Sequence, residues 1–184
     1  MLRTLPQTRD AQLGYRLASI GAFTLLTIIA ARITIPMQPV PFTLQTLAVV
    51  LAGLILGARD GALSQLAYLA LIALNLPVDA RGLGAASLLG PTAGYLVGFV
   101  AGAFVAGLLV ERGAGRMAQR WLAGIAGIAV IYLFGVVVLK ATTGIAWDAA
   151  WSAGVVPFLV PDLAKALVAA ALAEGGRSLL LRHS

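Results

Sequence analysis

The chain has 184 residues, of which 60% are hydrophobic and only 11% are charged. Soluble domains carry about 25% charged residues, so this composition excludes an ordinary soluble protein and indicates an integral membrane protein. The formal net charge of +6 comes from basic residues in short gaps between apolar runs, a pattern typical of membrane topology signals rather than of nucleic-acid binding. Because no cysteine is present, disulfide and thiol chemistry are excluded.

Six apolar runs follow one another along the chain, and each approaches the roughly 20 residues that a membrane-spanning helix needs. The first run follows a basic segment and could imitate a secretory signal, but five comparable runs come after it. We therefore expect one all-α transmembrane domain over residues 1–184, with no soluble domain. The expected helices cover residues 17–35, 42–57, 61–76, 90–110, 121–143 and 157–176.

Turn-forming residues mark the breaks between these helices. Three prolines follow the first helix, and proline cannot continue a helix beyond its first turn. They are Pro36, Pro39 and Pro41. Only residues 58–60 separate the second expected helix from the third, which predicts a tight hairpin near one membrane surface.

The positions of the basic residues predict how the helices cross the membrane. If the N-terminus lies in the cytoplasm, the inner segments carry more cations than the outer half, as the positive-inside rule requires. The inner set is Arg3, Arg9, Arg16, Arg59, Arg112, Arg116, Arg120, Arg177 and Arg182, and the outer set is Arg32, Arg81, Lys140 and Lys165. We therefore expect both termini in the cytoplasm. The outer acids, Asp79, Asp148 and Asp162, would then form a small mixed-charge vestibule with the outer cations.

Small residues recur at helical spacing in several expected helices. The longest stripe is Gly90, Gly94, Gly98 and Gly102, continued by Ala106, and Gly53 and Gly57 repeat the spacing. Such stripes let two helix backbones approach closely, and ordinary internal packing is the favoured interpretation. Ala18 and Ala22 begin a similar small face on the first helix, which could equally dock a partner protein.

The last apolar stretch contains an acid and a base, Asp162 and Lys165, three residues apart. On a helix they share one face. A charge at membrane depth costs at least about 3 kcal/mol, so each group needs a partner, water or a ligand. The pair could merely tie the last helix to its neighbours, or it could form the floor of a pocket for a small molecule.

Further polar and aromatic residues lie near the same side of the membrane. The expected start of the second helix carries Thr43, Gln45 and Thr46. Gln45 must satisfy its donor and acceptor groups inside the bundle, through another helix or a ligand. Tyr95, one turn into the fourth helix, could line the outer pocket or be an interfacial aromatic residue. The same choice holds for Trp147 and Trp151, in the expected loop before the last helix.

Several chemistries are missing from the sequence. No Gly-x-x-x-x-Gly-Lys-Ser/Thr loop occurs, so the chain does not itself bind ATP in the P-loop manner. The single histidine, His183, lies at the C-terminus, which argues against a histidine-based metal site or catalytic triad. We therefore expect no enzyme activity, no metal and no cofactor. A small membrane enzyme acting on lipid is the minor alternative.

Four sequence blocks point to a known family when taken together. They are Pro41-Phe-Thr-Leu-Gln-Thr, Leu76-Pro-Val, Leu89-Gly-Pro-Thr-Ala-Gly-Tyr and Pro157-Phe-Leu-Val-Pro-Asp-Leu-Ala-Lys. In this order they resemble the BioY family, the biotin-binding S components of energy-coupling-factor (ECF) transporters. The resemblance covers nearly the whole chain, and it implies a six-helix protein of the bacterial cell membrane that captures biotin at its outer face.

The resemblance also implies residues of the binding site. In the family, a polar group in the loop after the third helix acts with an Asp and a Lys of the last helix on the ureido ring, and Asp162 and Lys165 match that pair. The remaining expected ligand contacts are Gln45, Tyr95 and Thr43. The loop departs from the family's Leu-Pro-Val-Phe-Ala pattern, because this chain has Asp79 and Arg81 there. Arg81 could therefore face the biotin carboxylate.

Partners follow from the same resemblance: a membrane coupling protein and ATP-binding subunits supplied by other chains. Ala18 and Ala22 match the kind of small-residue pattern that S components use for docking. Two alternatives stay open, an S component for another vitamin such as thiamine or riboflavin, and a self-contained biotin carrier.

Overall fold

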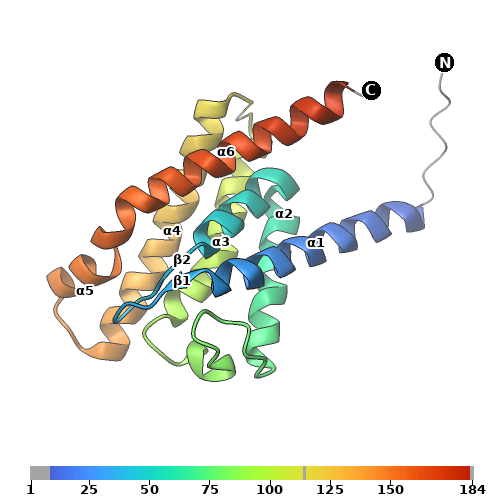
Figure 1. Ribbon diagram of the computed structural model, residues 1–184. Coiled ribbons are helices and arrows are strands. Elements are labelled where there is room, and N and C mark those ends of the chain that lie inside the picture. Colours follow the sequence, from blue (N-terminus) through green and yellow to red (C-terminus); the bar gives the residue numbers. More distant parts are fainter. Residues whose placement is uncertain (1–8, 114, 183–184) are drawn as a thin grey trace, which may run out of the picture.

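The computed structural model describes residues 9–113 and 115–182, and this part of the chain is almost entirely helical (Figure 1). Its elements are α1 (Arg9–Arg32), β1 (Thr34–Ile35), β2 (Phe42–Thr43), α2 (Gln45–Ala73), η1 (Gly84–Leu88), α3 (Ala93–Glu111), α4 (Met117–Thr143), α5 (Trp147–Gly154), η2 (Val156–Phe158) and α6 (Leu159–Arg182). The expected all-α class is therefore confirmed, apart from one two-residue ribbon.

Five stretches of the described residues are long and apolar enough to cross a membrane. They are Gln12–Arg32, Gln45–Ala73, Ala93–Glu111, Met117–Thr143 and Trp147–Gly175. The expected second and third helices, 42–57 and 61–76, largely overlap with the single element α2, so the count of six spans and the cytoplasmic placement of both termini stay predictions. Of the residues used for that placement, Arg3 lies outside the described residues, as do the side chains of Arg9, Arg177 and Arg182. His183 lies outside them too.

Helix α2 consists of two arms, residues 45–56 and 58–73, which meet at a sharp turn. Gly57 has a φ of 84° and a ψ of −176°, a conformation that side-chain-bearing residues rarely adopt. The two arms pack closely beside this turn, since a Cβ added to Gly61 would lie 2.9 Å from the Cα of Gly53. Glu111 of α3 accepts a 2.7 Å hydrogen bond from the backbone N–H of Ala58, the first residue of the second arm. A tight turn is therefore present as expected, but it lies at Gly57, and residues 58–60, which were expected to separate two helices, are helical.

The centre of the bundle is built by α3, which packs against α2 on one side and α4 on the other. Cβ atoms added to Gly94, Gly98 or Gly102 would run into Phe134, Ile131 or the backbone of Gly127, all on α4. The glycine stripe therefore packs helices together, as expected. Gly90 is an exception, since it precedes α3 and its nearest such neighbours are 3.9 Å away.

Helix α1 packs along the second arm of α2 through hydroxyl and amide groups. Thr24 donates a 2.9 Å hydrogen bond to the carbonyl of Ser64, and Thr27 lies 3.2 Å from the side-chain amide of Gln65. All four residues are buried. In an apolar surrounding such bonds help to hold helices together.

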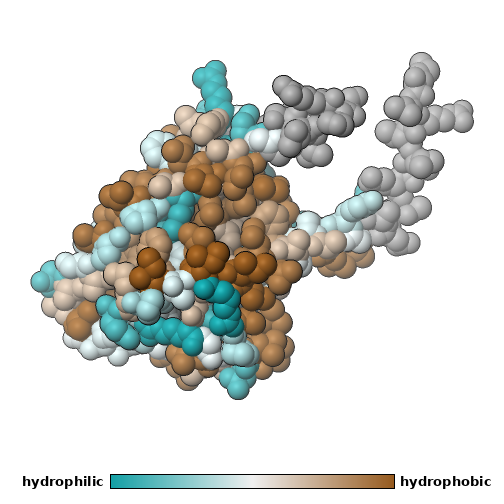
Figure 2. All heavy atoms as spheres, viewed as in Figure 1, coloured by the Kyte–Doolittle hydropathy of each residue, from teal (hydrophilic) through white to brown (hydrophobic). Residues whose placement is uncertain are grey.

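Polar surface gathers at one end of the molecule, which we call the ribbon end because it carries β1 and β2. The strands pair antiparallel, with Thr34 opposite Thr43 and Ile35 opposite Phe42. In Figure 2, hydrophobic side chains cover the helices, while hydrophilic ones collect around the ribbon and the neighbouring loop between α2 and α3.

Several element boundaries at the ribbon end differ from the expected ones. Helix α2 begins at Gln45, so Thr43 belongs to β2 rather than to a helix. Helix α3 begins at Ala93, because the preceding Gly-Pro-Thr forms a turn. Trp147 and Trp151 were expected in a loop, but they lie on α5, and both side chains are exposed.

Candidate functional site

A cavity lies at the ribbon end. It is enclosed by the helices, by the ribbon segment and by the loop between α2 and α3. It contains about 640 Å³ of space free of protein atoms, part of it open to solvent. Its walls come from α2, α3, α4 and α6, from the ribbon and from the loop between α2 and α3. They comprise Val40, Pro41, Thr43, Gln45, Thr46, Asp79, Ala80, Arg81, Ser87, Thr92, Tyr95, Leu96, Phe99, Ile131, Tyr132, Phe158, Asp162 and Lys165. The structure thus brings together all six residues expected to contact a ligand.

Asp162 and Lys165 lie in the first two turns of α6 and form an ion pair. The Lys165 Nζ is 2.7 Å from Asp162 Oδ1, and the two residues are only 7% and 2% exposed. Helix α6 starts directly after the Pro157-containing turn η2, which places this acid and base near the helix start, facing the bundle. A buried ion pair of this kind is weak support for stability, because desolvation offsets much of its attraction.

The Asp162 carboxylate receives hydrogen bonds from three elements. Tyr132 of α4 donates to Oδ2 at 2.7 Å, and Thr46 of α2 donates to Oδ1 at 2.9 Å, beside Lys165. A carboxylate has about four lone-pair positions, so three of them are occupied. The geometry fixes the orientation of the carboxylate and leaves one acceptor position.

The Lys165 ammonium also has three hydrogen-bond partners within the protein. It donates to Asp162, to the backbone carbonyl of Thr43 at 2.6 Å and to the Thr46 hydroxyl at 3.2 Å. It also lies 4.0 Å from the centre of the Phe42 ring, which favours a cation. Phe42 stacks on Phe158 with 6.3 Å between ring centres. The ribbon is thereby attached to the start of α6 through the ammonium.

Gln45 has protein partners as well as a place on the cavity wall. Its Nε2 donates a 2.8 Å hydrogen bond to the hydroxyl of Tyr68, which in turn donates to the carbonyl of Val78. Its Oε1 lies 3.2 Å from the Thr43 hydroxyl. Gln45 therefore ties both arms of α2 to the loop that covers the cavity.

The loop between α2 and α3 is held by Asp79 and Arg81. Asp79 is 3% exposed, and its carboxylate accepts the backbone N–H groups of Arg81 at 3.1 Å and Gly84 at 2.8 Å. The Arg81 side chain is exposed and donates to the carbonyl of Pro39 at 2.6 Å. Asp79 thus shapes its own loop, while Arg81 joins that loop to the ribbon segment and keeps further N–H donors for a ligand.

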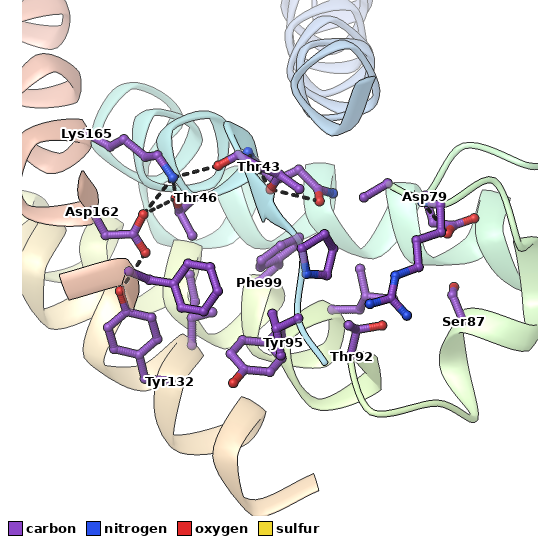
Figure 3. A pocket seen from close by; sticks show the side chains of 18 residues that line it. Thr43, Thr46, Asp79, Ser87, Thr92, Tyr95, Phe99, Tyr132, Asp162 and Lys165 are labelled. Atoms are coloured by element: carbon purple, nitrogen blue, oxygen red, sulfur yellow. Dashed lines mark hydrogen bonds and ion pairs between the residues drawn. The ribbon is translucent and has the colours of Figure 1, made fainter. Parts of the chain in front are cut away.

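Tyr95 is mainly a packing residue that reaches the cavity. Its hydroxyl donates a 2.8 Å hydrogen bond to the carbonyl of Gly154 on α5, and its ring fills the space beside Gly135 on α4. Figure 3 shows Tyr95 and Phe99 between two polar ends: Asp162, Lys165 and Thr46 at one, and Asp79 and Ser87 at the other.

Sequence reasoning did not assign Thr46, Tyr132 or Phe42 to the site. Tyr132 is one aromatic residue within a long apolar run, and nothing in the sequence distinguishes it from a packing residue. Thr46 was noted in the polar segment where α2 begins, but a threonine there is equally compatible with ordinary packing. Among the described residues no group of three or more His, Asp and Glu side chains could hold a metal ion.

Comparisons with known proteins agree on one family. The family model described as "BioY family" matches residues 5–182. The biotin transporter BioY of Thermotoga maritima is 45% identical over 161 residues, which cover 86% of this chain and 93% of the relative. The probable biotin transporter BioY of Pyrococcus horikoshii is 43% identical over 156 residues, or 84% and 91% of the two chains.

A solved structure has the same fold. It is the 2.1 Å crystal structure of the S-component for biotin from an ECF-type ABC transporter. The TM-score is 0.84 at 27% sequence identity, with 93% of this chain and 94% of that chain covered. The similarity therefore extends over almost the whole of both chains.

Proposed function

The chain belongs to the BioY family, and we infer that it is a biotin transporter whose cavity at the ribbon end binds the vitamin. The observation that carries this proposal is the buried Asp162–Lys165 pair opening into that cavity. A ligand-binding role explains why an acid and a base, which contribute little to stability, lie in the apolar part of the bundle.

The ureido ring of biotin is complementary to this pair. It carries two N–H donors and one carbonyl acceptor, so the free acceptor position of Asp162 can take an N–H, and the Lys165 ammonium can donate to the carbonyl. Such charge-assisted hydrogen bonds are strong where water is excluded. The fused thioether ring and the valeryl chain then lie against the apolar walls that Leu96, Phe99 and Ile131 provide.

The opposite end of the cavity suits the biotin carboxylate. Arg81 lies on the cavity wall, it is exposed, and two backbone carbonyls occupy only part of its donor fork. A guanidinium binds a carboxylate with good geometry. Biotin would therefore lie with its ureido ring at Asp162 and Lys165 and its carboxylate at Arg81, near the mouth.

Uptake would take place in an ECF-type assembly in the bacterial plasma membrane. In this proposal the ribbon end faces outward, both termini lie in the cytoplasm, and a coupling protein with ATP-binding subunits supplies the energy. Ala18 and Ala22 support a docking role for α1, because both side chains are exposed on a helix that otherwise packs on α2.

Equilibrium binding of labelled biotin to the purified protein in detergent tests the proposal. Asp162→Asn should weaken binding by a factor of about ten or more, since a charged partner in a buried site is lost. Asp148→Asn is the matched control, because Asp148 is exposed on α5, and it should bind biotin as the wild type does. Competition by unlabelled thiamine or riboflavin, or unchanged affinity of Asp162→Asn, would contradict the proposed site.

A further inference from the structure

The Lys165 ammonium is surrounded by three acceptors that belong to the protein itself. A lysine ammonium has three donors, and here they go to Thr43, Asp162 and Thr46. A ligand carbonyl that accepts from Lys165 in the proposed way competes with these three acceptors for the N–H groups. Binding at this group is therefore an exchange of hydrogen bonds.

The three acceptors differ in how easily they can be replaced. The backbone carbonyl of Thr43 is 2.6 Å away and is fixed by the ribbon pairing, and the Asp162 oxygen at 2.7 Å carries the opposite charge. The Thr46 hydroxyl is neutral, and its distance of 3.2 Å is the longest of the three. Thr46 thus makes the weakest of the three contacts to the ammonium.

The Thr46 hydroxyl also has the hydrogen-bonding pattern of the expected ligand. It accepts from Lys165 and at the same time donates to Asp162 Oδ1 at 2.9 Å. A ureido group offers the same two functions, an acceptor in its carbonyl and a donor in each N–H. Figure 3 shows the hydroxyl between the two charged side chains, at the edge of the cavity.

We propose that the Thr46 hydroxyl is an internal substitute for the ligand: it occupies the position on Lys165 that the ureido carbonyl takes on binding. This rests on the proposed function. After the exchange Thr46 keeps its bond to Asp162, and the remaining acceptor position of the carboxylate receives a ureido N–H. Thr46 is then a positioning residue that lowers affinity, since its contact with Lys165 must be given up.

Removal of the hydroxyl at constant shape tests the proposal. Thr46→Val leaves one N–H of Lys165 without its acceptor in the free protein, so biotin should bind more tightly, by about threefold to tenfold. Thr46→Ser keeps the hydroxyl and should bind as the wild type does. The affinity of Thr46→Val for dethiobiotin, which keeps the ureido carbonyl but lacks the sulfur, should rise over the wild type by the same factor as its affinity for biotin. Thr46→Ala serves in the same way if the valine variant does not fold.

The outcomes separate this proposal from the proposed function. Unchanged or weaker binding of biotin by a folded Thr46→Val or Thr46→Ala protein would overturn the exchange. If the wild-type protein binds biotin in the same assay, the proposed function stands. No binding of biotin by the wild-type protein would overturn both. Melting temperatures of the ligand-free variants identify a purely structural effect, because such an effect would lower stability without raising affinity.

Discussion

The charged residues at the two ends of the cavity differ in burial and in how firmly they are held. Asp162 and Lys165 are buried and are held by hydrogen bonds with α2, α4 and the ribbon. Arg81 is exposed and belongs to a loop. A rigid buried end can discriminate between rings, because a ligand that lacks the matching donors and acceptors leaves buried polar groups unpaired. The exposed cationic end can only add an attraction for an anion.

Arg81→Gln tests the assignment of the carboxylate end. The variant should bind biotin about threefold to tenfold more weakly, because an exposed charged contact is lost, but it should bind biotin methyl ester as the wild type does. Arg59→Gln removes an exposed charge on the second arm of α2, away from the cavity, and should change neither affinity. An equal loss for acid and ester would show instead that Arg81 only holds the loop against Pro39.

The site could be predicted in part from single residues. Charges in an apolar helix are conspicuous, so Asp162 and Lys165 could be found from their cost at membrane depth alone. Thr46 and Tyr132 could not, because a threonine and a tyrosine are compatible with ordinary packing. Their role depends on the approach of α2 and α4 to α6, which is a tertiary property.

At the scale of elements, the bundle depends on close contacts between helix backbones. Gly102 of α3 faces α4, and a Cβ there would lie 2.7 Å from Ile131 Cγ1 and 2.8 Å from the carbonyl oxygen of Gly127. Gly21 of α1 is its counterpart on an open face, since nothing in the described part of the chain lies within 4 Å of an added Cβ. A side chain added at Gly102 would therefore collide with α4, whereas one added at Gly21 would meet no neighbour in the described part of the chain.

Gly102→Ala should destabilise the protein by about 1–3 kcal/mol, because the backbones of α3 and α4 must move apart. Gly21→Ala should be neutral or slightly stabilising, since alanine favours a helix more than glycine does. Thermal unfolding of both variants in detergent measures the difference. Equal melting temperatures would mean that α3 and α4 do not pack through this glycine stripe.

The element boundaries show what the sequence pattern could and could not supply. Hydrophobic runs located the helices, but the break within α2 was expected at charged residues and lies at Gly57, whose positive φ is set by how the two arms pack. A glycine in an apolar run fits close packing as well as a turn. The backbone angles of Gly57 and the contact of Glu111 with the second arm identify it as a turn.

On the scale of the whole molecule, the cavity and the proposed docking surface on α1 are separate. The cavity lies at the ribbon end, whereas Ala18 and Ala22 lie in the middle part of α1, whose last residue, Arg32, precedes the ribbon. Leu25 and Ile29 extend the exposed surface of the same helix, at 56% and 51% exposure. A bulky residue on this surface can therefore interfere with a partner without reaching the ligand.

Ala22→Trp should leave the affinity for biotin in detergent unchanged. In vesicles that contain the coupling protein and ATP-binding subunits, the same variant should lose most ATP-dependent uptake, because the added ring holds the partner away from α1. Leu133→Trp on α4, across the bundle and 64% exposed, is the control for a large ring on an exposed helix, and its uptake should match the wild type. Uptake by the wild-type chain alone in vesicles, driven by an ion gradient, would identify a self-contained carrier. Retained uptake by Ala22→Trp in the complete assembly would place the docking surface on another helix.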